Sequence, residues 1–236
     1  MSKTYAIADL HGRFDLLIPA LDQIAKHANR HKFKIVAIGD YIDRGPESRQ
    51  IIEHLMALQK AMAPIVCLQG NHESMMVETI RTPLHPEWWI GNGGGQTLIS
   101  YGHPRSGDYQ PDVVPEEHLV WLENLPLMHI DQHRVFVHAG VDQLKPLDQQ
   151  DPQSVLWKIY DGNDPGGHDM RHVVHGHHAR VDGPILLSGR TNLDTCAYYT
   201  GRLVVGVFDD DLAGGPVDFI EVRALPRLTP MAETSP

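Results

Sequence analysis

Five short apolar runs in this 236-residue sequence each end at a residue able to bind a metal ion, with glycine close by. Aspartate, histidine and asparagine supply these residues, and cysteine supplies none. The five run ends read Asp9-Leu10-His11-Gly12, Gly39-Asp40-Tyr41-Ile42-Asp43-Arg44-Gly45, Gly70-Asn71-His72-Glu73, His138-Ala139-Gly140 and His175-Gly176-His177-His178. Mixed nitrogen and oxygen donors of this kind suit Mn, Fe or Zn better than a thiolate zinc site or an all-oxygen calcium site.

Each of these residues, taken alone, also has an ordinary structural explanation. A histidine after a strand is usually a polar group at the strand exit, Asp40 can cap a turn, and Asn71 can cap the helix that follows it. Five such endings in consecutive order favour a common site, because ligands bind at the carboxyl ends of the strands of an open α/β sheet. We therefore predict that the five segments converge on one metal centre.

The elements that must position these residues follow a βαβ pattern, in which short runs rich in Val and Ile alternate with longer mixed stretches. Strands are expected near residues 5–8, 34–38, 65–68, 134–137, 173–174, 185–187, 203–208 and 217–222. Helices are expected at 14–29, 47–60, 73–81, 115–124 and 153–160. Residues 82–112 read as a loop-rich insertion. We predict one domain over residues 1–224 and a flexible C-terminal tail over 225–236.

The overall composition is that of a globular protein with an acidic surface. Twenty Lys and Arg against 30 Asp and Glu give a net charge of −10 with His neutral. This charge argues against a nucleic-acid binder, because neutralisation of phosphates supplies most of that affinity. The apolar runs are far shorter than the roughly 20 residues that cross a bilayer, and the N-terminus lacks a signal-peptide pattern. We expect a cytoplasmic protein without a membrane partner, and the sequence leaves its oligomeric state open.

In chain order the five motifs resemble the signature of calcineurin-like metallophosphoesterases, and Gly-Asp-x-x-Asp-Arg-Gly and Gly-Asn-His-Glu resemble its phosphoprotein-phosphatase branch. Asn92-Gly93-Gly94 and the run from Arg190 to Thr195 are similar to bacterial and phage members, which include serine/threonine protein phosphatases and symmetrical dinucleoside-tetraphosphate hydrolases. The resemblance extends from about residue 4 to residue 222. It implies a four-layer α/β/β/α sandwich of two mixed sheets flanked by helices, with two metals at the strand ends.

The resemblance also implies a ligand set for two divalent cations, with Mn²⁺ favoured and Fe or Zn as alternatives. Asp40 would bridge the two ions. The full set of implied ligands is Asp9, His11, Asp40, Asn71, His138 and His177.

Further residues receive roles in the reaction by the same resemblance. His72 would be the general acid, oriented by Asp43, and Arg44 would hold the phosphate together with Asn71. We add His178 as a candidate substrate contact and His175 as a candidate hydrogen-bond partner of a ligand.

These roles predict hydrolysis of phosphomonoesters, including phosphoserine or phosphothreonine in proteins, by direct attack of a metal-bridging hydroxide. Two departures weaken the case for a protein phosphatase: Gln69 stands where Arg usually precedes Gly-Asn-His-Glu, and Ile159 stands, after Lys158, where another phosphate-binding Arg is expected. Bidentate guanidinium contacts are what hold a phosphomonoester dianion. The alternatives are therefore a hydrolase of symmetrical dinucleoside polyphosphates or other nucleotides, or a promiscuous phosphodiesterase or phosphotriesterase.

An alternative of another class is a non-catalytic scaffold that binds a phosphorylated partner. The intact set of Asp43, Arg44 and His72 argues against it, because a scaffold has no need of an acid and its orienting carboxylate. The partner we expect is a small phosphorylated substrate or a phosphoprotein.

Three aromatic residues near the triple glycine, Trp88, Trp89 and Tyr101, leave two interpretations open. They would suit stacking on a base if they lined a substrate groove, but such residues more often pack in a satellite core.

Overall fold

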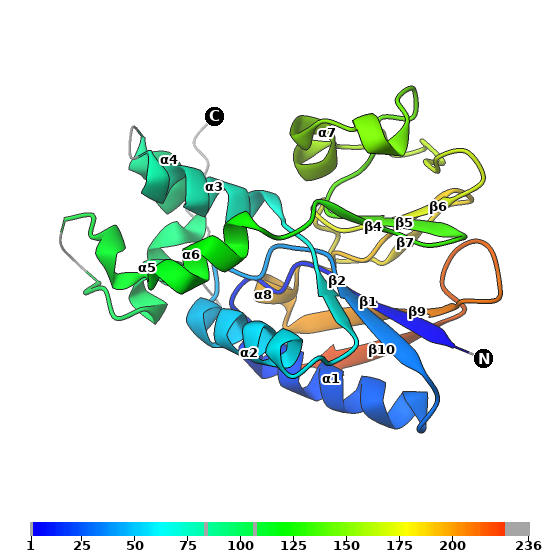
Figure 1. The fold of residues 1–236 in the computed structure, drawn as a ribbon, viewed down its shortest axis with the longest axis horizontal. Coiled ribbons are helices and arrows are strands. Elements are labelled where there is room, and N and C mark those ends of the chain that lie inside the picture. Colours follow the sequence, from blue (N-terminus) through cyan, green and yellow to red (C-terminus); the bar gives the residue numbers. More distant parts are fainter. Residues whose placement is uncertain (1, 83–84, 106–107, 225–236) are drawn as a thin grey trace.

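The computed structural model describes residues 2–82, 85–105 and 108–224, and it shows two five-stranded mixed sheets flanked by helices (Figure 1). The first sheet has the order β10-β9-β1-β2-β3 and the second has the order β4-β5-β6-β8-β7. The strands are β1 (Lys3–Ile7), β2 (Phe33–Ala37), β3 (Ile65–Cys67), β4 (Met128–Ile130), β5 (Arg134–Val137), β6 (His172–His175), β7 (Ile185–Leu186), β8 (Arg190–Asn192), β9 (Arg202–Asp209) and β10 (Asp218–Arg223).

The helices lie outside the two sheets, which confirms the expected four-layer sandwich. They are α1 (Phe14–Ala28), α2 (Ser48–Lys60), α3 (Asn71–Arg81), α4 (Pro86–Trp89), α5 (Gly95–Ser100), α6 (Glu116–Glu123), α7 (Pro152–Trp157) and α8 (Ala197–Thr200). From bottom to top, Figure 1 shows α1 and α2, the first sheet, the second sheet and α7. Helices α3 to α6 gather at one end of this sandwich.

Alternation along the strands produces these layers, because successive side chains of a strand point to opposite faces. In β1, Tyr5 and Ile7 join the core beneath the helices, whereas Ala6 joins the core between the sheets. In β5, Val135 and Val137 pack towards α7 on the outer face of the second sheet. The core between the sheets includes an edge-to-face pair of Phe136 and Phe208, with ring centroids 5.6 Å apart.

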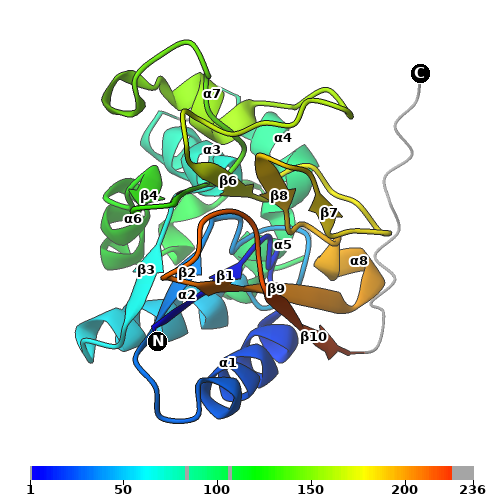
Figure 2. The same cartoon turned by 90° about the vertical axis from the view of Figure 1, so that its right-hand side faces the viewer.

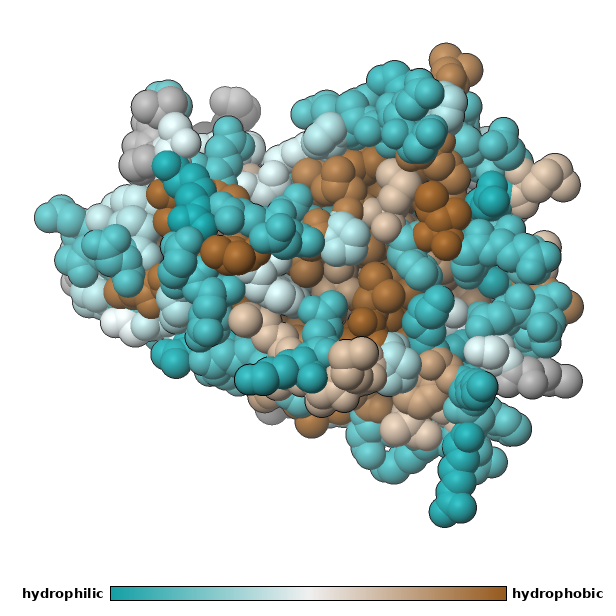
Figure 3. Space-filling view, in the orientation of Figure 1, coloured by the Kyte–Doolittle hydropathy of each residue, from teal (hydrophilic) through white to brown (hydrophobic). Residues whose placement is uncertain are grey.

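Parallel pairing brings the five motifs to common sheet edges. Strands β1, β2 and β3 run parallel to one another, as do β5, β6 and β8, while β9, β10, β4 and β7 pair antiparallel. The motifs follow β1, β2, β3, β5 and β6 directly in sequence. The same topology leaves β3 and β4 as edge strands on one side of the molecule, as Figure 2 shows. Figure 3 shows hydrophobic residues gathered on that face of an otherwise mostly hydrophilic surface.

Three sequence expectations need correction. Residues 82–112 are not mainly loop, since they carry α4, a π-helical turn over Ile90–Gly94 and α5; only Gly93, at φ +108°, departs from helical geometry within that turn. Helix α3 begins at Asn71, so the third motif lies in its first turn. Strand β8 was not expected, because its residues are polar although all are buried.

Other expectations concern the chain ends and membranes. The proposed tail over residues 225–236 lies outside the described residues. Within the part of the chain that the structure describes, no helix has both the length and the apolar composition needed to cross a bilayer.

Candidate metal centre

Asp40 follows β2 and faces histidines that come from both sheets. Its Oδ2 lies 3.4 Å from Nε2 of His11, and its Oδ1 lies 3.3 Å from Nε2 of His138. Two groups of potential ligands result, namely His11–Asp40–His72 and Asp40–His138–His177, and in each the ligand atoms lie within 4.8 Å of one another. Asp40 belongs to both groups. The geometry is therefore that of two adjacent cation sites that share one carboxylate.

Backbone carbonyls orient two of these imidazoles. Nδ1 of His11 donates to the Ile42 carbonyl over 2.8 Å, and Nδ1 of His138 donates to the Ile38 carbonyl over 2.9 Å. With the proton held on Nδ1, each ring presents the lone pair of Nε2 to Asp40. Fixing the tautomer through the other ring nitrogen is the usual way in which a protein prepares a histidine ligand.

The donor set around Asn71 tests whether a cation fits. Oδ1 of Asn71 lies 2.8 Å from Nε2 of His138 and 3.1 Å from Nδ1 of His177. Because Nε2 of His138 carries a lone pair, two electron-rich atoms face each other at this distance. A divalent cation between them would satisfy both atoms, and mixed nitrogen and oxygen donors suit Mn, Fe or Zn. The residues present therefore fit the group that the sequence implied.

Asp9 lies beside these groups, and among the described residues neither ligand group includes it. Its two carboxylate oxygens accept a hydrogen bond from the His177 backbone N–H over 3.0 and 3.1 Å. Burial, followed by the charges of Asp194 and Asp40, raises the pKa of Asp9 well above its ordinary value. A Cβ on Gly176 would lie 1.8 Å from Oδ2 of Asp9, so this close approach requires glycine.

The backbone around the site is strained. Several candidate residues adopt φ between +43° and +71°, a region that non-glycine residues rarely occupy. Such residues cost of order 1 kcal/mol or more each and cluster at functional sites, where the surrounding structure holds them in place. The candidate residues with positive φ are Asp9, His11, Asp40, Asp43, Arg44 and His177.

His72, Asp43 and Arg44 form one connected group. Nδ1 of His72 donates to Oδ2 of Asp43 over 2.6 Å. The Arg44 guanidinium lies 3.1 Å from Nε2 of His72 and 2.7 Å from Nε2 of His11. Burial opposes a charge on His72, but the charge of Asp40 and the hydrogen bond to Asp43 outweigh it and raise the pKa of His72. The His72 ring is thus held by the Asp43 carboxylate beside the Arg44 guanidinium.

Burial keeps the other histidines of the two groups neutral. It lowers the pKa of His11 and His138, and it lowers the pKa of His177 to about 4. Neutral imidazole is the form that binds metal, so these three rings are ready to coordinate near neutral pH.

Two residues that hold Asp43 escaped the sequence analysis as site residues. The indole nitrogen of buried Trp89 donates to Oδ2 of Asp43, and the Thr97 hydroxyl donates to Oδ1 over 2.6 Å. Trp89 ends α4 and Thr97 lies in α5, on either side of the glycine-containing turn Ile90–Gly94. The signal in the sequence was that they flank Gly93-Gly94, but their target lies more than 40 residues earlier in the chain.

Glu73 is a further residue that the role assignment left out. Its carboxylate accepts hydrogen bonds of 2.8 Å from the backbone N–H groups of Gly70, Asp40 and Tyr41. It therefore fixes the turn after β2 against the first turn of α3. The sequence did contain this residue within the Gly-Asn-His-Glu motif.

His175 and His178 lie near the centre with different surroundings. The His175 ring is buried, with Nδ1 near the Gly176 carbonyl and Nε2 3.2 Å from the Arg190 guanidinium. Its role beside a ligand stays a prediction. His178 is partly exposed, and its backbone makes its hydrogen bonds: the N–H donates to the Gly176 carbonyl, and the carbonyl accepts from the Asn192 side-chain amide. Its contact with a substrate stays a prediction.

Gln69 and Ile159, which stand where the family usually has arginine, make no contact with the candidate ligands in the hydrogen bonds of the described residues. Gln69 donates from its side chain to the Leu122 carbonyl over 2.9 Å. The Ile159 side chain is 57% exposed, and the Lys158 ammonium lies 5.0 Å from the ring centre of Tyr160. Arg44 is thus the arginine, among those described, whose guanidinium contacts the candidate ligands.

The three aromatic residues near the triple glycine separate in the structure. Trp89 and Tyr101 are buried, and the Tyr101 hydroxyl bonds to His118. Trp88 is 50% exposed. Packing therefore explains two of the three residues.

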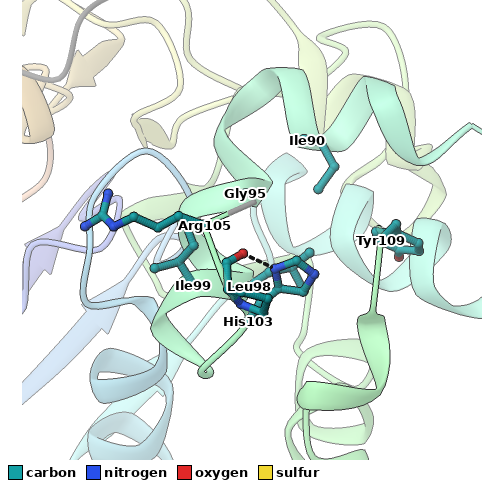
Figure 4. Close-up of a pocket in the computed structure, with 8 residues that line it drawn as sticks. Ile90, Gly95, Leu98, Ile99, His103, Arg105 and Tyr109 are labelled. Atoms are coloured by element: carbon teal, nitrogen blue, oxygen red, sulfur yellow. Dashed lines mark hydrogen bonds between the residues drawn. The ribbon is translucent and has the colours of Figure 1, made fainter. Parts of the chain in front are cut away.

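A pocket in the helical end of the molecule is separate from the metal centre. It has a volume of about 190 Å³ and is lined by residues of the 90–109 segment, among them Ile90, Leu98 and Tyr109 (Figure 4). None of its lining residues is a candidate ligand.

Comparisons with known proteins place the chain in a family. Residues 2–208 match the calcineurin-like phosphoesterase family. A symmetrical bis(5′-nucleosyl)-tetraphosphatase of Pseudomonas fluorescens is 31% identical over 140 residues, which is 58% of this chain and 42% of that protein. The chain thus spans less than half the length of this relative. The asymmetrical bis(5′-nucleosyl)-tetraphosphatase PrpE of Bacillus cereus is 27% identical over 221 residues, covering 84% of this chain and 87% of the relative.

A solved structure supports the fold. The crystal structure of a putative diadenosine tetraphosphatase superimposes with a TM-score of 0.67 at 20% identity, covering 94% of each chain. The family uses a dinuclear metal centre, and its members are metal-dependent phosphoester hydrolases, in agreement with the two ligand groups around Asp40. The extent of the family match, together with this geometry, shows that the chain belongs to the calcineurin-like phosphoesterase family.

Proposed function

We propose that this protein hydrolyses dinucleoside polyphosphates with the help of two divalent cations. The observation that carries the chemistry is the position of Asp40, whose two oxygens face a histidine of each ligand group. The substrate class is supported by the relatives, because both tetraphosphatases described above are named for dinucleoside tetraphosphate cleavage. The PrpE relative matches over most of both chains.

The chain supplies enough donors for both cations. Asp9, His11 and Asp40 would hold one ion. Asp40, Asn71, His138 and His177 would hold the other, with Asp40 shared between them. When bound, two such cations supply an activated water for in-line attack and stabilise charge on the attacking and leaving oxygens.

Arg44 binds the phosphate in this proposal. Its guanidinium lies beside Nε2 of both His11 and His72. A phosphoryl oxygen bound there would be within reach of Arg44 and of His72. Two divalent cations exceed the negative charge of Asp9 and Asp40, and Arg44 adds to the surplus. The pocket is then positive inside a chain of net charge −10, which favours a small phosphorylated anion.

His72 protonates the leaving oxygen. Asp43 fixes Nδ1, so the proton available for transfer is the one on Nε2, which faces the same space as Arg44. The raised pKa of His72 favours the protonated ring. General acid catalysis of this kind contributes about 10²–10⁴-fold to the rate.

A site with a single arginine for the substrate phosphate favours a polyphosphate over a phosphomonoester. A monoester dianion is held best by paired guanidinium groups. Gln69 donates to the Leu122 carbonyl and Ile159 is exposed, so Arg44 is left to bind the phosphate from this side. A polyphosphate chain spreads its charge over several groups and makes less demand on a single dianion site.

Steady-state kinetics on metal-stripped protein reconstituted with Mn²⁺ test this function. The panel is diadenosine tetraphosphate, a phosphoserine peptide, p-nitrophenyl phosphate and bis(p-nitrophenyl) phosphate, with nucleotide products separated by chromatography. We expect kcat/KM for the dinucleotide to exceed the others at least tenfold, and Asp40→Asn to abolish it. The exposed Asp148→Asn serves as control. A preference for the phosphopeptide would overturn the substrate class, and equal rates for wild type and Asp40→Asn would overturn the site.

A further inference from the structure

Two tryptophans from different parts of the fold stack next to the candidate metal centre. Trp88 lies in α4, within the helical end, and Trp157 is the last residue of α7, which covers the second sheet. Their ring centroids are 5.8 Å apart with 27° between the ring planes. Figures 1 and 2 show both helices on the same side of the molecule. The pair therefore joins the helical end to the second sheet.

One member of this pair, Trp157, contacts the candidate ligand His177. The Trp157 ring meets the His177 ring edge to face, with centroids 6.1 Å apart and 84° between the planes. Trp88 is thus two ring contacts away from a histidine of the second ligand group. A phosphate held at the metals would carry its nucleoside into the neighbourhood of this pair.

The Trp88 side chain is partly exposed to solvent. Its side chain is 50% exposed although the ring is stacked on Trp157, so the indole still presents apolar area to solvent. Trp157 is only partly buried and packs against both helix-covered cores, which holds it in place behind Trp88. An indole supported on one side and open elsewhere is a rigid platform for a flat aromatic group.

The other aromatic residues that contact the centre are less exposed than Trp88. The Tyr198 ring touches His11 edge to face, and the Arg44 guanidinium lies 4.9 Å from its ring centre. Trp89 is buried and gives its N–H to Asp43. Of Trp88, Trp89 and Tyr198, Trp88 is the one whose side chain is classed as exposed.

We infer that Trp88, supported by Trp157, is the stacking platform for one nucleobase of the substrate. This inference rests on the proposed function and adds the residue that selects for a base beside the cleaved polyphosphate. Stacking tolerates any base, because every base has a π face. The platform therefore predicts selection for nucleotides over base-free polyphosphates without a strong preference among the four bases.

Binding measured separately from catalysis tests the platform. Calorimetry on the Mn²⁺-loaded protein compares a methylene-bridged, non-hydrolysable diadenosine tetraphosphate with inorganic tetraphosphate. We expect Trp88→Ala to weaken the dinucleotide about tenfold or more and to leave inorganic tetraphosphate within about twofold. Trp88→Phe keeps an aromatic face and is expected to retain most of the affinity. Leu212→Ala, which truncates a side chain of similar exposure (53%) in another region, is the matched control.

The outcomes distinguish the platform from its alternatives. Equal weakening of both ligands by Trp88→Ala, together with a lower melting temperature, would mean that the stack only joins α4 to α7, and this would overturn the inference. Unchanged dinucleotide affinity would overturn it as well. If the wild type cleaves the dinucleotide and Trp88→Ala has no effect on binding, the inference fails and the proposed function stands. If Trp88-dependent binding occurs without cleavage, the proposed function fails and the platform stands.

Discussion

Trp89 donates a hydrogen bond from its indole nitrogen to Oδ2 of Asp43 over 2.9 Å. The same oxygen accepts from Nδ1 of His72, and the Thr97 hydroxyl donates to the other oxygen. Both Trp89 and Asp43 are fully buried. The carboxylate therefore has no freedom to turn, and the direction in which it holds the His72 ring is set by residues of α4 and α5.

Trp89→Phe removes the N–H donor and keeps most of the ring volume. We expect kcat to fall about tenfold for substrates with poor leaving groups and less for nitrophenyl esters, because an acid that is less well oriented matters most when the leaving oxygen needs a proton. Trp121→Phe is the control, since it removes an indole bond of 2.8 Å to Gln59 away from the site. Equal losses in the two variants would contradict the orienting role.

His72→Asn keeps a polar group of smaller size and removes the acid. The expected result is a chain that still binds two metal ions, measured by elemental analysis, but loses about 10²-fold or more in kcat with alkyl phosphates. The loss should be much smaller with p-nitrophenyl phosphate, whose leaving group needs no proton. Loss of one ion would instead assign His72 as a ligand, as its place beside His11 and Asp40 permits.

Gly176→Ala tests the close approach of the second sheet to Asp9. Its Cβ would lie 1.8 Å from Oδ2 of Asp9, so the carboxylate or the backbone must move. We expect loss of metal affinity, measured by calorimetry, with a destabilisation of about 1–3 kcal/mol from overpacking. Gly162→Ala is the matched control, because a Cβ there meets nothing within 4 Å. Normal metal binding by Gly176→Ala would exclude Asp9 as a ligand.

Acid should destabilise the metal-free protein through its buried histidines. Burial lowers the pKa of His175 to about 3, against roughly 6.5 in an unfolded chain. Between these values the unfolded chain binds a proton that the folded chain does not, so the free energy of unfolding rises with pH. This contribution is complete above about pH 6.5 and is lost as the pH falls towards 3, with at most about 1.4 kcal/mol per pH unit for one group.

Urea unfolding at pH 7 and pH 5 measures this effect. Buried Glu73 and Asp194, whose pKa values burial raises to about 8 and about 7, act in the opposite direction in both chains. We therefore expect the change from pH 7 to pH 5 to be less destabilising in His175→Gln than in the parent protein. His85→Gln, at an exposed position, should leave the difference unchanged. His172 and His177, whose pKa values burial lowers to about 4, act in the same direction. A pH difference in His175→Gln as large as in the parent protein would contradict the assignment.

The strand ends were predictable because their signal is local. An apolar run that stops at Asp40 or His138, with glycine beside it, marks both the strand and the residue that follows it. Parallel pairing of neighbouring strands then brings these ends together without further information. This local signal predicted that the five segments converge, and the resemblance to calcineurin-like metallophosphoesterases implied the sandwich.

The environment of Asp43 was not predictable in the same way. Trp89 and Thr97 reach it only because a helical segment, interrupted at Gly93, folds back onto the first sheet. Strand β8 was missed since Arg190, Thr191 and Asn192 show no apolar pattern, although tertiary packing buries all three. Contacts of this type depend on distant parts of the chain, so neither hydrophobic periodicity nor residue type predicts them.

The pair of Phe136 and Phe208 packs one sheet against the other, and the ligand groups draw on both halves of that contact. Asp40 comes from the first sheet and His138 and His177 from the second, so the second ligand group needs both halves. Truncating Phe208, which is not itself a ligand, would weaken the contact between the sheets and thereby weaken binding of the cation that needs both of them. Metal affinity therefore reports on the packing between the two sheets.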